Sequence, residues 1–298
     1  MTERQALLCA ATTSLTWGLT GVFVRLLPAI PPLTIAAGRL VIALAAVLPV
    51  LALSPDTRHG LGNALRYPCS FVLALLLAGY YLLATTAFQM APVAEVALLL
   101  STPPLFVLVI RAVRGEPSSP GEIRGAVLAV SGIALILAPR MSFSAEQSGL
   151  HFWGNVIAIC ASASTAIYAH TYRVLAEQKR APQTSGVSVL TFAMGGAILT
   201  LAAGLAPTSS GLAELKSGDL PVFLALGVLS TAVPTLGFAM AAKRLPAIIT
   251  ATISLFIPLF SGFFAYLILG ERLSALFVAG CALVLWGVSM IARGGRKG

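Results

Sequence analysis

A pattern of proline, glycine and glutamate residues occurs twice in this 298-residue chain, and both copies lie in apolar sequence. The separations between equivalent residues agree to within one residue, so a single insertion relates the two copies. The chain is therefore predicted to contain two homologous halves, residues 1–145 and 146–298. The residues of the first copy and then of the second are Pro92, Pro104, Gly115, Glu116, Gly125, Gly132, and Pro246, Pro258, Gly270, Glu271, Gly280, Gly287.

The composition excludes an ordinary soluble domain. Hydrophobic residues make up 58% of the chain and charged residues only 10%, and the mean hydropathy is +0.93. A soluble surface needs more charge than this. The net charge of +9 comes from basic residues at the ends of apolar segments. We expect these residues to orient the chain in a lipid bilayer rather than to bind nucleic acid.

The chain divides into ten apolar segments at its clusters of charge, proline and glycine. A hydrocarbon core about 30 Å thick requires roughly 20 apolar residues per helix, and each segment meets that length. The predicted fold class is an all-α polytopic membrane protein with ten transmembrane helices. The predicted spans are 5–27, 33–53, 67–90, 93–113, 121–139, 150–175, 184–205, 220–242, 247–269 and 274–292.

Most of the 19 Lys and Arg residues fall on one side of this arrangement, which predicts cytoplasmic N- and C-termini. Five helices per half is an odd number, so the second half is expected to be inverted relative to the first. Gly115-Glu116 would then face the cytoplasm and Gly270-Glu271 the outside. The longest loops are expected at residues 54–66 and 207–219.

With these features, the chain resembles the EamA-like, ten-helix family of the drug/metabolite transporter superfamily. The resemblance covers nearly the whole length and rests on Trp17 and Gly18, the segment 32–39, and the duplicated pattern. It implies a secondary transporter with a central cavity between its halves, located in a bacterial inner (plasma) membrane. The early aromatic residues look most similar to bacterial exporters of aromatic and other neutral amino acids. Drugs or nucleotide and sugar metabolites are the alternative cargo.

Four aromatic residues are candidates for substrate binding because each lies in the middle of a span. Rings with polar tips offer a stacking surface and a hydrogen bond together. An alternative is that such residues form belts at the membrane interface. Adjacent helical residues point about 100° apart, so only one of the two neighbouring tyrosines can point directly into a cavity. The candidates are Trp17, Tyr80, Tyr81 and Tyr168.

Three of the ionisable residues within the predicted spans are candidates for function. A charge at the bilayer centre costs roughly 2.5–3.5 kcal/mol, so such residues usually face protein or water. Arg39 either binds a substrate carboxylate, or snorkels, or pairs with Glu95 as a structural lock. Glu95 and His170 are the candidates for proton coupling, although His170 could instead be a structural polar residue.

Prolines fall at corresponding points in two predicted helices, Pro104 in the fourth and Pro258 in the ninth. Proline removes a helical hydrogen bond and bends the helix. Because the positions correspond, we predict that these residues act as hinges of alternating access. The repeated glycines are expected to allow close contact between helices.

No motif indicates catalysis, and a membrane-embedded enzyme is the alternative from another functional class. The sequence contains no ATP-binding phosphate loop and no HExxH zinc motif. The 4 cysteines are scattered through apolar sequence without the spacing of metal ligands. No catalytic residue, metal or cofactor is therefore expected. The expected partners are a small-molecule substrate and the lipid bilayer.

Overall fold

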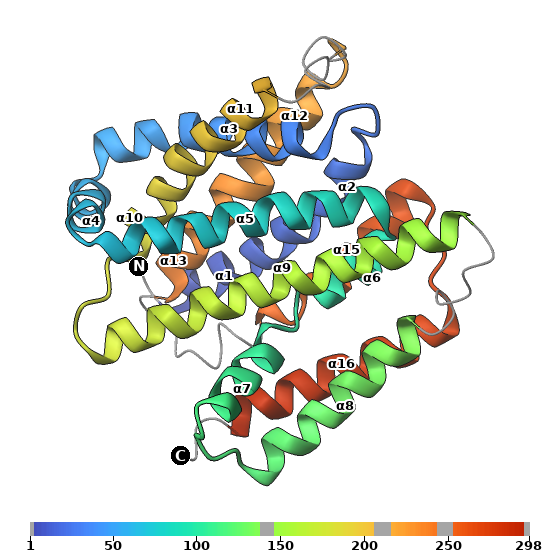
Figure 1. Ribbon diagram of the computed structural model, residues 1–298. Helices are drawn as coiled ribbons and strands as arrows, with labels where there is room; N and C mark the ends of the chain where they lie inside the picture. Colours follow the sequence, from blue (N-terminus) through green and yellow to red (C-terminus); the bar gives the residue numbers. More distant parts are fainter. Residues whose placement is uncertain (1–2, 138–145, 206–215, 243–252, 295–298) are drawn as a thin grey trace.

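The computed structural model describes residues 3–137, 146–205, 216–242 and 253–294, and this part of the chain folds as a bundle of helices without a β-strand (Figure 1). Eight of its helical stretches are long and apolar enough to cross a membrane. In a bilayer, a helix satisfies all of its own backbone hydrogen bonds, which makes it a suitable spanning element. The protein is an integral membrane protein.

Residues 3–137, the described part of the first half, form eight α-helices. The breaks between some of these helices lie inside single predicted spans. Their bounds are α1 Glu3–Gly18, α2 Thr20–Arg25, α3 Pro32–Leu53, α4 Pro55–Arg66, α5 Pro68–Met90, α6 Val93–Leu99, α7 Pro103–Val113 and α8 Pro120–Leu137.

The described residues of the second half form α-helices and three short π-helical segments, labelled η. Their bounds are α9 Glu146–Glu177, α10 Thr184–Leu190, η2 Thr191–Gly195, α11 Gly196–Leu205, α12 Leu220–Gly227, η4 Val228–Ala232, α13 Val233–Ala242, α15 Ile257–Phe264, η5 Ala265–Leu269 and α16 Ala275–Gly294.

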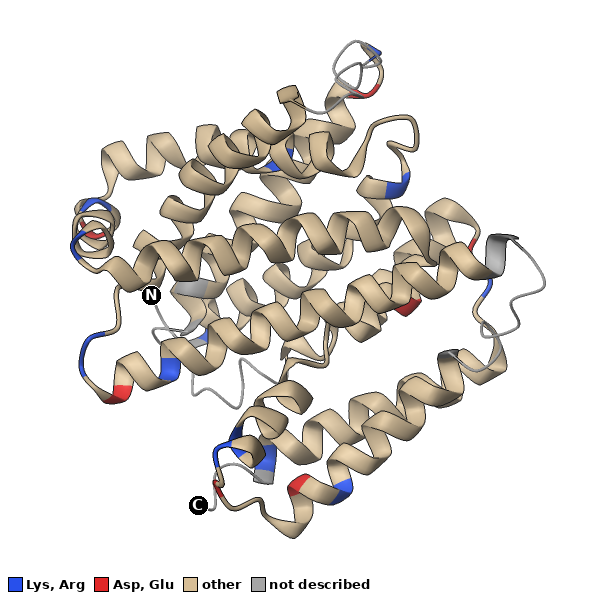
Figure 2. Cartoon of the chain, viewed as in Figure 1, with Lys and Arg blue, Asp and Glu red and all other residues tan. Residues whose placement is uncertain are grey.

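Eight of the ten predicted spans correspond to the eight spanning stretches. The other two, 121–139 and 247–269, extend beyond the described residues, as does Pro246 of the second repeat copy. Their described parts are α8, of 18 residues, and the apolar stretch Ile257–Leu269. The total of ten crossings therefore stays a prediction. Charged residues lie mainly at the two ends of the bundle, and Lys and Arg gather at the end that holds α4 (Figure 2).

The prediction of a loop at residues 54–66 is wrong, because this segment forms α4. The hydroxyl of Ser54 accepts a hydrogen bond from the backbone N–H of Thr57 at 3.3 Å and so caps the helix. Pro55 occupies the first helical position, where its missing N–H costs nothing. The cap and proline were visible in the sequence, but the low hydrophobicity of the segment concealed its helical character.

The fourth and ninth spans are interrupted at corresponding places, at residues 100–102 and 255–256. Pro104 and Pro258 each lie at the second position of the helix that follows the interruption. The prediction that these prolines interrupt the helices is confirmed; their action as hinges stays a prediction.

Hydroxyl groups compensate for the backbone hydrogen bonds lost at these interruptions. The side chain of Thr102 donates to the carbonyl of Leu99 at 2.7 Å. At the corresponding interruption in the ninth span, the side chain of Ser14 donates to the carbonyl of Ile253 at 3.0 Å. Such compensation allows a helix to be broken at membrane depth.

Helices α8 and α16 lie side by side, and their glycines meet in pairs (Figure 1). A Cβ atom added to Gly125 would lie 2.6 Å from the carbonyl oxygen of Gly287, and one added to Gly132 would lie 2.6 Å from that of Gly280. The predicted role of these glycines in close helix contact is confirmed. The pairing is reciprocal, because a Cβ atom added to Gly280 would lie 2.9 Å from the carbonyl oxygen of Gly132 and one added to Gly287 would lie still closer to that of Gly125.

Candidate functional site

Arg39 of α3 is a buried cation surrounded by neutral groups. Only 2% of its surface is exposed. The guanidinium donates to the hydroxyl of Thr231 at 3.1 Å, to the hydroxyl of Thr85 at 3.4 Å and to the carbonyl of Ser230 at 3.4 Å. Within the described part of the chain, no carboxylate pairs with it. A buried charge without an opposite charge is costly, so this site is suited to a ligand that brings a negative group.

Tyr81 covers one face of this guanidinium. The central carbon of the Arg39 guanidinium lies 4.8 Å from the centre of the Tyr81 ring, within the range of a cation–π contact. The Tyr81 hydroxyl lies 3.4 Å from the hydroxyl of Thr235. Tyr80 is half-buried, and its ring centre lies 5.5 Å from that of Tyr81. Of the two neighbouring tyrosines, Tyr81 is therefore the one that contacts Arg39.

The π-helical segment η4 supplies two of the partners of Arg39. Its Thr231 hydroxyl accepts from Arg39 while donating to the carbonyl of Leu226 at 2.8 Å. The neighbouring Ser230 hydroxyl donates to the carbonyl of Thr16 in α1 at 2.9 Å. π-Helical turns often occur at functional sites. Sequence reasoning missed this segment; the one available signal was a Ser-Thr pair within an apolar span.

The remaining aromatic candidates, Trp17 and Tyr168, pack against other aromatic rings. Trp17 of α1 is half-buried and its ring lies 5.6 Å from that of Phe238 in α13. Trp17 therefore adjoins the helix that continues from η4. Tyr168 of α9 instead stacks on Tyr172 with 6.0 Å between ring centres. The hydroxyl of Tyr172 donates to the carbonyl of Pro182 at 2.7 Å.

The alternative in which Arg39 pairs with Glu95 is wrong. Glu95 of α6 is only 6% exposed, and its carboxylate accepts a hydrogen bond from the side-chain amide of Asn155 at 2.9 Å. The other coupling candidate, His170, lies far along α9, where its Nε2 atom is 2.7 Å from a guanidinium nitrogen of Arg114. The three ionisable candidates thus occupy three separate environments.

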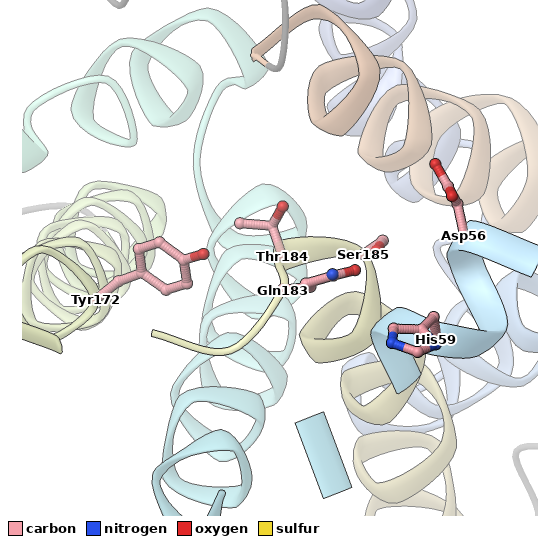
Figure 3. Close-up of a pocket in the computed structure, with 6 residues that line it drawn as sticks. All are labelled: Asp56, His59, Tyr172, Gln183, Thr184 and Ser185. Carbon is pink, nitrogen blue, oxygen red and sulfur yellow. The ribbon is translucent and has the colours of Figure 1, made fainter. Parts of the chain in front are cut away.

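A polar pocket of about 380 Å³ opens where α4, the end of α9 and the start of α10 meet (Figure 3). Arg39 does not line it. Since Arg39 is enclosed by its partners, a solute reaches it only after the surrounding helices move apart. The residues that line the pocket are Asp56, His59, Tyr172, Gln183, Thr184 and Ser185.

Comparison with known proteins decides the family. The model of the EamA-like transporter family matches residues 4–138 and matches again over residues 152–293. The chain belongs to the EamA-like transporter family. As a member of this family, it is a membrane transporter of small molecules, and the family comprises transporters rather than enzymes. It lies within the drug/metabolite transporter superfamily.

Solved structures include chains with a fold similar to that of this protein. One, described only as the crystal structure of a protein, is 20% identical with a TM-score of 0.62 and covers 99% of both chains. At this identity the likeness concerns the fold alone. No curated protein matches the chain.

Proposed function

We propose that this EamA-like protein is a secondary transporter that exports small amphipathic metabolites, with aromatic and other neutral amino acids as its substrates. The observation that carries this proposal is the buried Arg39 guanidinium, held by neutral groups next to the ring of Tyr81. The carboxylate of an amino acid would supply the missing negative charge. The rings of Tyr81 and Trp17 would offer stacking surface to an aromatic side chain.

The proposed mechanism is alternating access between two inverted five-helix halves, residues 1–145 and 146–298, in a bacterial inner membrane with both termini cytoplasmic. The interruptions before Pro104 and Pro258 would be the hinges. Two observations support this arrangement. The family model matches the chain twice, and the glycines of α8 and α16 pair reciprocally. Substrate would bind near the bilayer midplane, where the two halves meet.

Tyr80 and Tyr168 complete the proposed substrate-binding set. Glu95 and His170 are the proposed proton-coupling residues. If Glu95→Gln and His170→Ala both leave transport driven by a pH gradient unchanged in liposomes, neither residue couples transport to protons.

Competition against labelled phenylalanine in proteoliposomes tests the substrate class. Tryptophan and phenylalanine should compete, whereas phenylalanine amide, which lacks the carboxylate, should compete about tenfold less well. Arg39→Gln should abolish this difference between amino acid and amide. The matched control is Arg173→Gln, because Arg173 is exposed and pairs with Glu177 on the same helix. Absence of competition by every aromatic amino acid would remove the proposed substrate and leave the carrier assignment intact.

A further inference from the structure

A groove of about 490 Å³ runs between α7 and the C-terminal part of α9, outside the Arg39 site. One side of it is aliphatic, formed by Val109, Ile110 and Val113 of α7 with Val174 and Leu175 of α9. Val109 is 51% exposed and Val113 is 84% exposed. Exposed aliphatic side chains on a membrane-spanning helix face lipid tails.

The other end of the groove is basic. Arg114 lies directly after α7, and one of its guanidinium nitrogens is 2.7 Å from Nε2 of His170. A guanidinium can only donate hydrogen bonds, so the histidine nitrogen accepts. The imidazole is then neutral and carries its proton on Nδ1, from which it can donate to an anion. The Arg114 charge and an imidazole N–H therefore lie at the same end of the aliphatic groove.

The charge of Arg114 differs from that of its neighbours. Arg111 pairs with Glu116, which precedes α8, and with Glu122 inside α8. Arg173 pairs with Glu177. Among the described residues, no carboxylate pairs with Arg114. It is the arginine at this end of α7 whose charge remains available to a bound anion.

The position of the groove relative to the bilayer limits the kind of anion. Helix α7 completes the spanning stretch Val93–Val113, so its aliphatic side lies at the depth of acyl chains. Arg114, immediately beyond it, lies at the level of the headgroups. An anion free in solution would match only the basic end, whereas a phospholipid matches both ends. Basic pockets between transmembrane helices bind anionic headgroups in this way.

We propose that this groove binds an anionic phospholipid, with its phosphate against Arg114 and His170 and an acyl chain along Val109, Val113 and Val174. The bound lipid would hold α7 against α9. The proposal depends on the membrane placement of the chain and not on the substrate that it carries.

Thermal unfolding of the purified full-length protein in mild detergent tests this proposal. Added phosphatidylglycerol should raise the melting temperature, and phosphatidylcholine or inorganic phosphate should not. Arg114→Gln should weaken the binding of phosphatidylglycerol about fivefold, the effect of one basic side chain near an anionic surface. The control Arg173→Gln should bind phosphatidylglycerol as the wild type does.

A second variant keeps the test informative if Arg114→Gln fails to fold. Val113→Glu places a negative charge at an exposed position in the wall of the groove, next to Arg114, and it should repel phosphatidylglycerol without disturbing the core. Equal shifts with both lipids, or phosphatidylglycerol binding that survives both Arg114→Gln and Val113→Glu, would overturn the proposal. A shift produced by inorganic phosphate alone would also overturn it, since it would assign the site to a free anion.

Discussion

The two Gly-Glu turns have the same backbone conformation but different partners. Gly115 and Gly270 have φ angles of +73° and +68°, a region that favours glycine. Beyond this point the turns differ. The Glu271 carboxylate crosses to the first half and accepts from the backbone N–H of Val93 at 3.0 Å. Glu116 instead pairs with Arg111 of its own half, at 3.2 Å.

The surroundings of the two carboxylates differ as well. The Glu271 side chain is 16% exposed and lies 3.9 Å from the Arg25 guanidinium, which also donates to the carbonyl of Gln89. The Glu116 side chain is 45% exposed. One turn therefore ties the second half of the molecule to the first, while the other stabilises a local hairpin. A repeated motif preserves the local turn, but its energetic contribution depends on what the rest of the fold places opposite.

Glu271→Ala should produce the largest loss of stability among changes in the two turns. It leaves the backbone N–H of Val93 without its charged acceptor, and we expect a loss of about 1.5–3 kcal/mol in the free energy of unfolding. Titration with denaturing detergent in mixed micelles measures this loss. A cost no larger than that of Glu116→Ala would show that the contact between the halves contributes nothing extra.

The paired variants Gly115→Ala and Gly270→Ala should have nearly equal effects. Neither position has an atom within 4 Å of an added Cβ, so the cost comes from the left-handed backbone and is about 1–2 kcal/mol in each case. The same titration applies to both. A much larger cost for Gly270→Ala would indicate that strain at this turn also displaces Glu271.

Glu116→Ala should have a small effect, about 0.2–1 kcal/mol, because the pair with Arg111 is partly exposed to solvent. Arg111 also retains its contact with Glu122 in this variant. Salt provides the control: the effect of Glu116→Ala should shrink as ionic strength rises. A loss above 2 kcal/mol would mean that this turn, too, supports contacts between distant parts of the chain.

The pH dependence of Glu271 should have a definite sign. Burial raises the pKa of its carboxyl, although the N–H of Val93 and the charge of Arg25 act in the opposite direction. A folded-state pKa above the unfolded one gives a stabilising contribution that is present at low pH and lost as pH rises through the folded pKa. The wild type should therefore gain stability relative to Glu271→Ala on mild acidification. Melting curves of both proteins between neutral and acidic pH measure this, and a difference of the opposite sign would contradict it.

Several features of the fold followed from local sequence. The length and hydrophobicity of the segments predicted the spanning helices because the bilayer imposes both. Pro104 and Pro258 predicted the helix interruptions, since proline has no N–H to donate. The spacing of Gly125, Gly132 and their copies predicted close helix contact. Helix α4 was predictable from Ser54 and Pro55, but its polar sequence was interpreted as a loop.

The Arg39 site could not be predicted from the sequence in the same way. Its partners Thr85, Ser230 and Thr231 come from α5 and η4, far from α3 along the chain, and no local pattern specifies which helices pack together. The sequence placed a charge in an apolar span, and the cost of burying it required some partner. Tertiary packing alone brought hydroxyls rather than Glu95 to that charge, and it likewise placed Val93 within reach of Glu271, because both contacts join helices whose relative positions are set by the whole bundle.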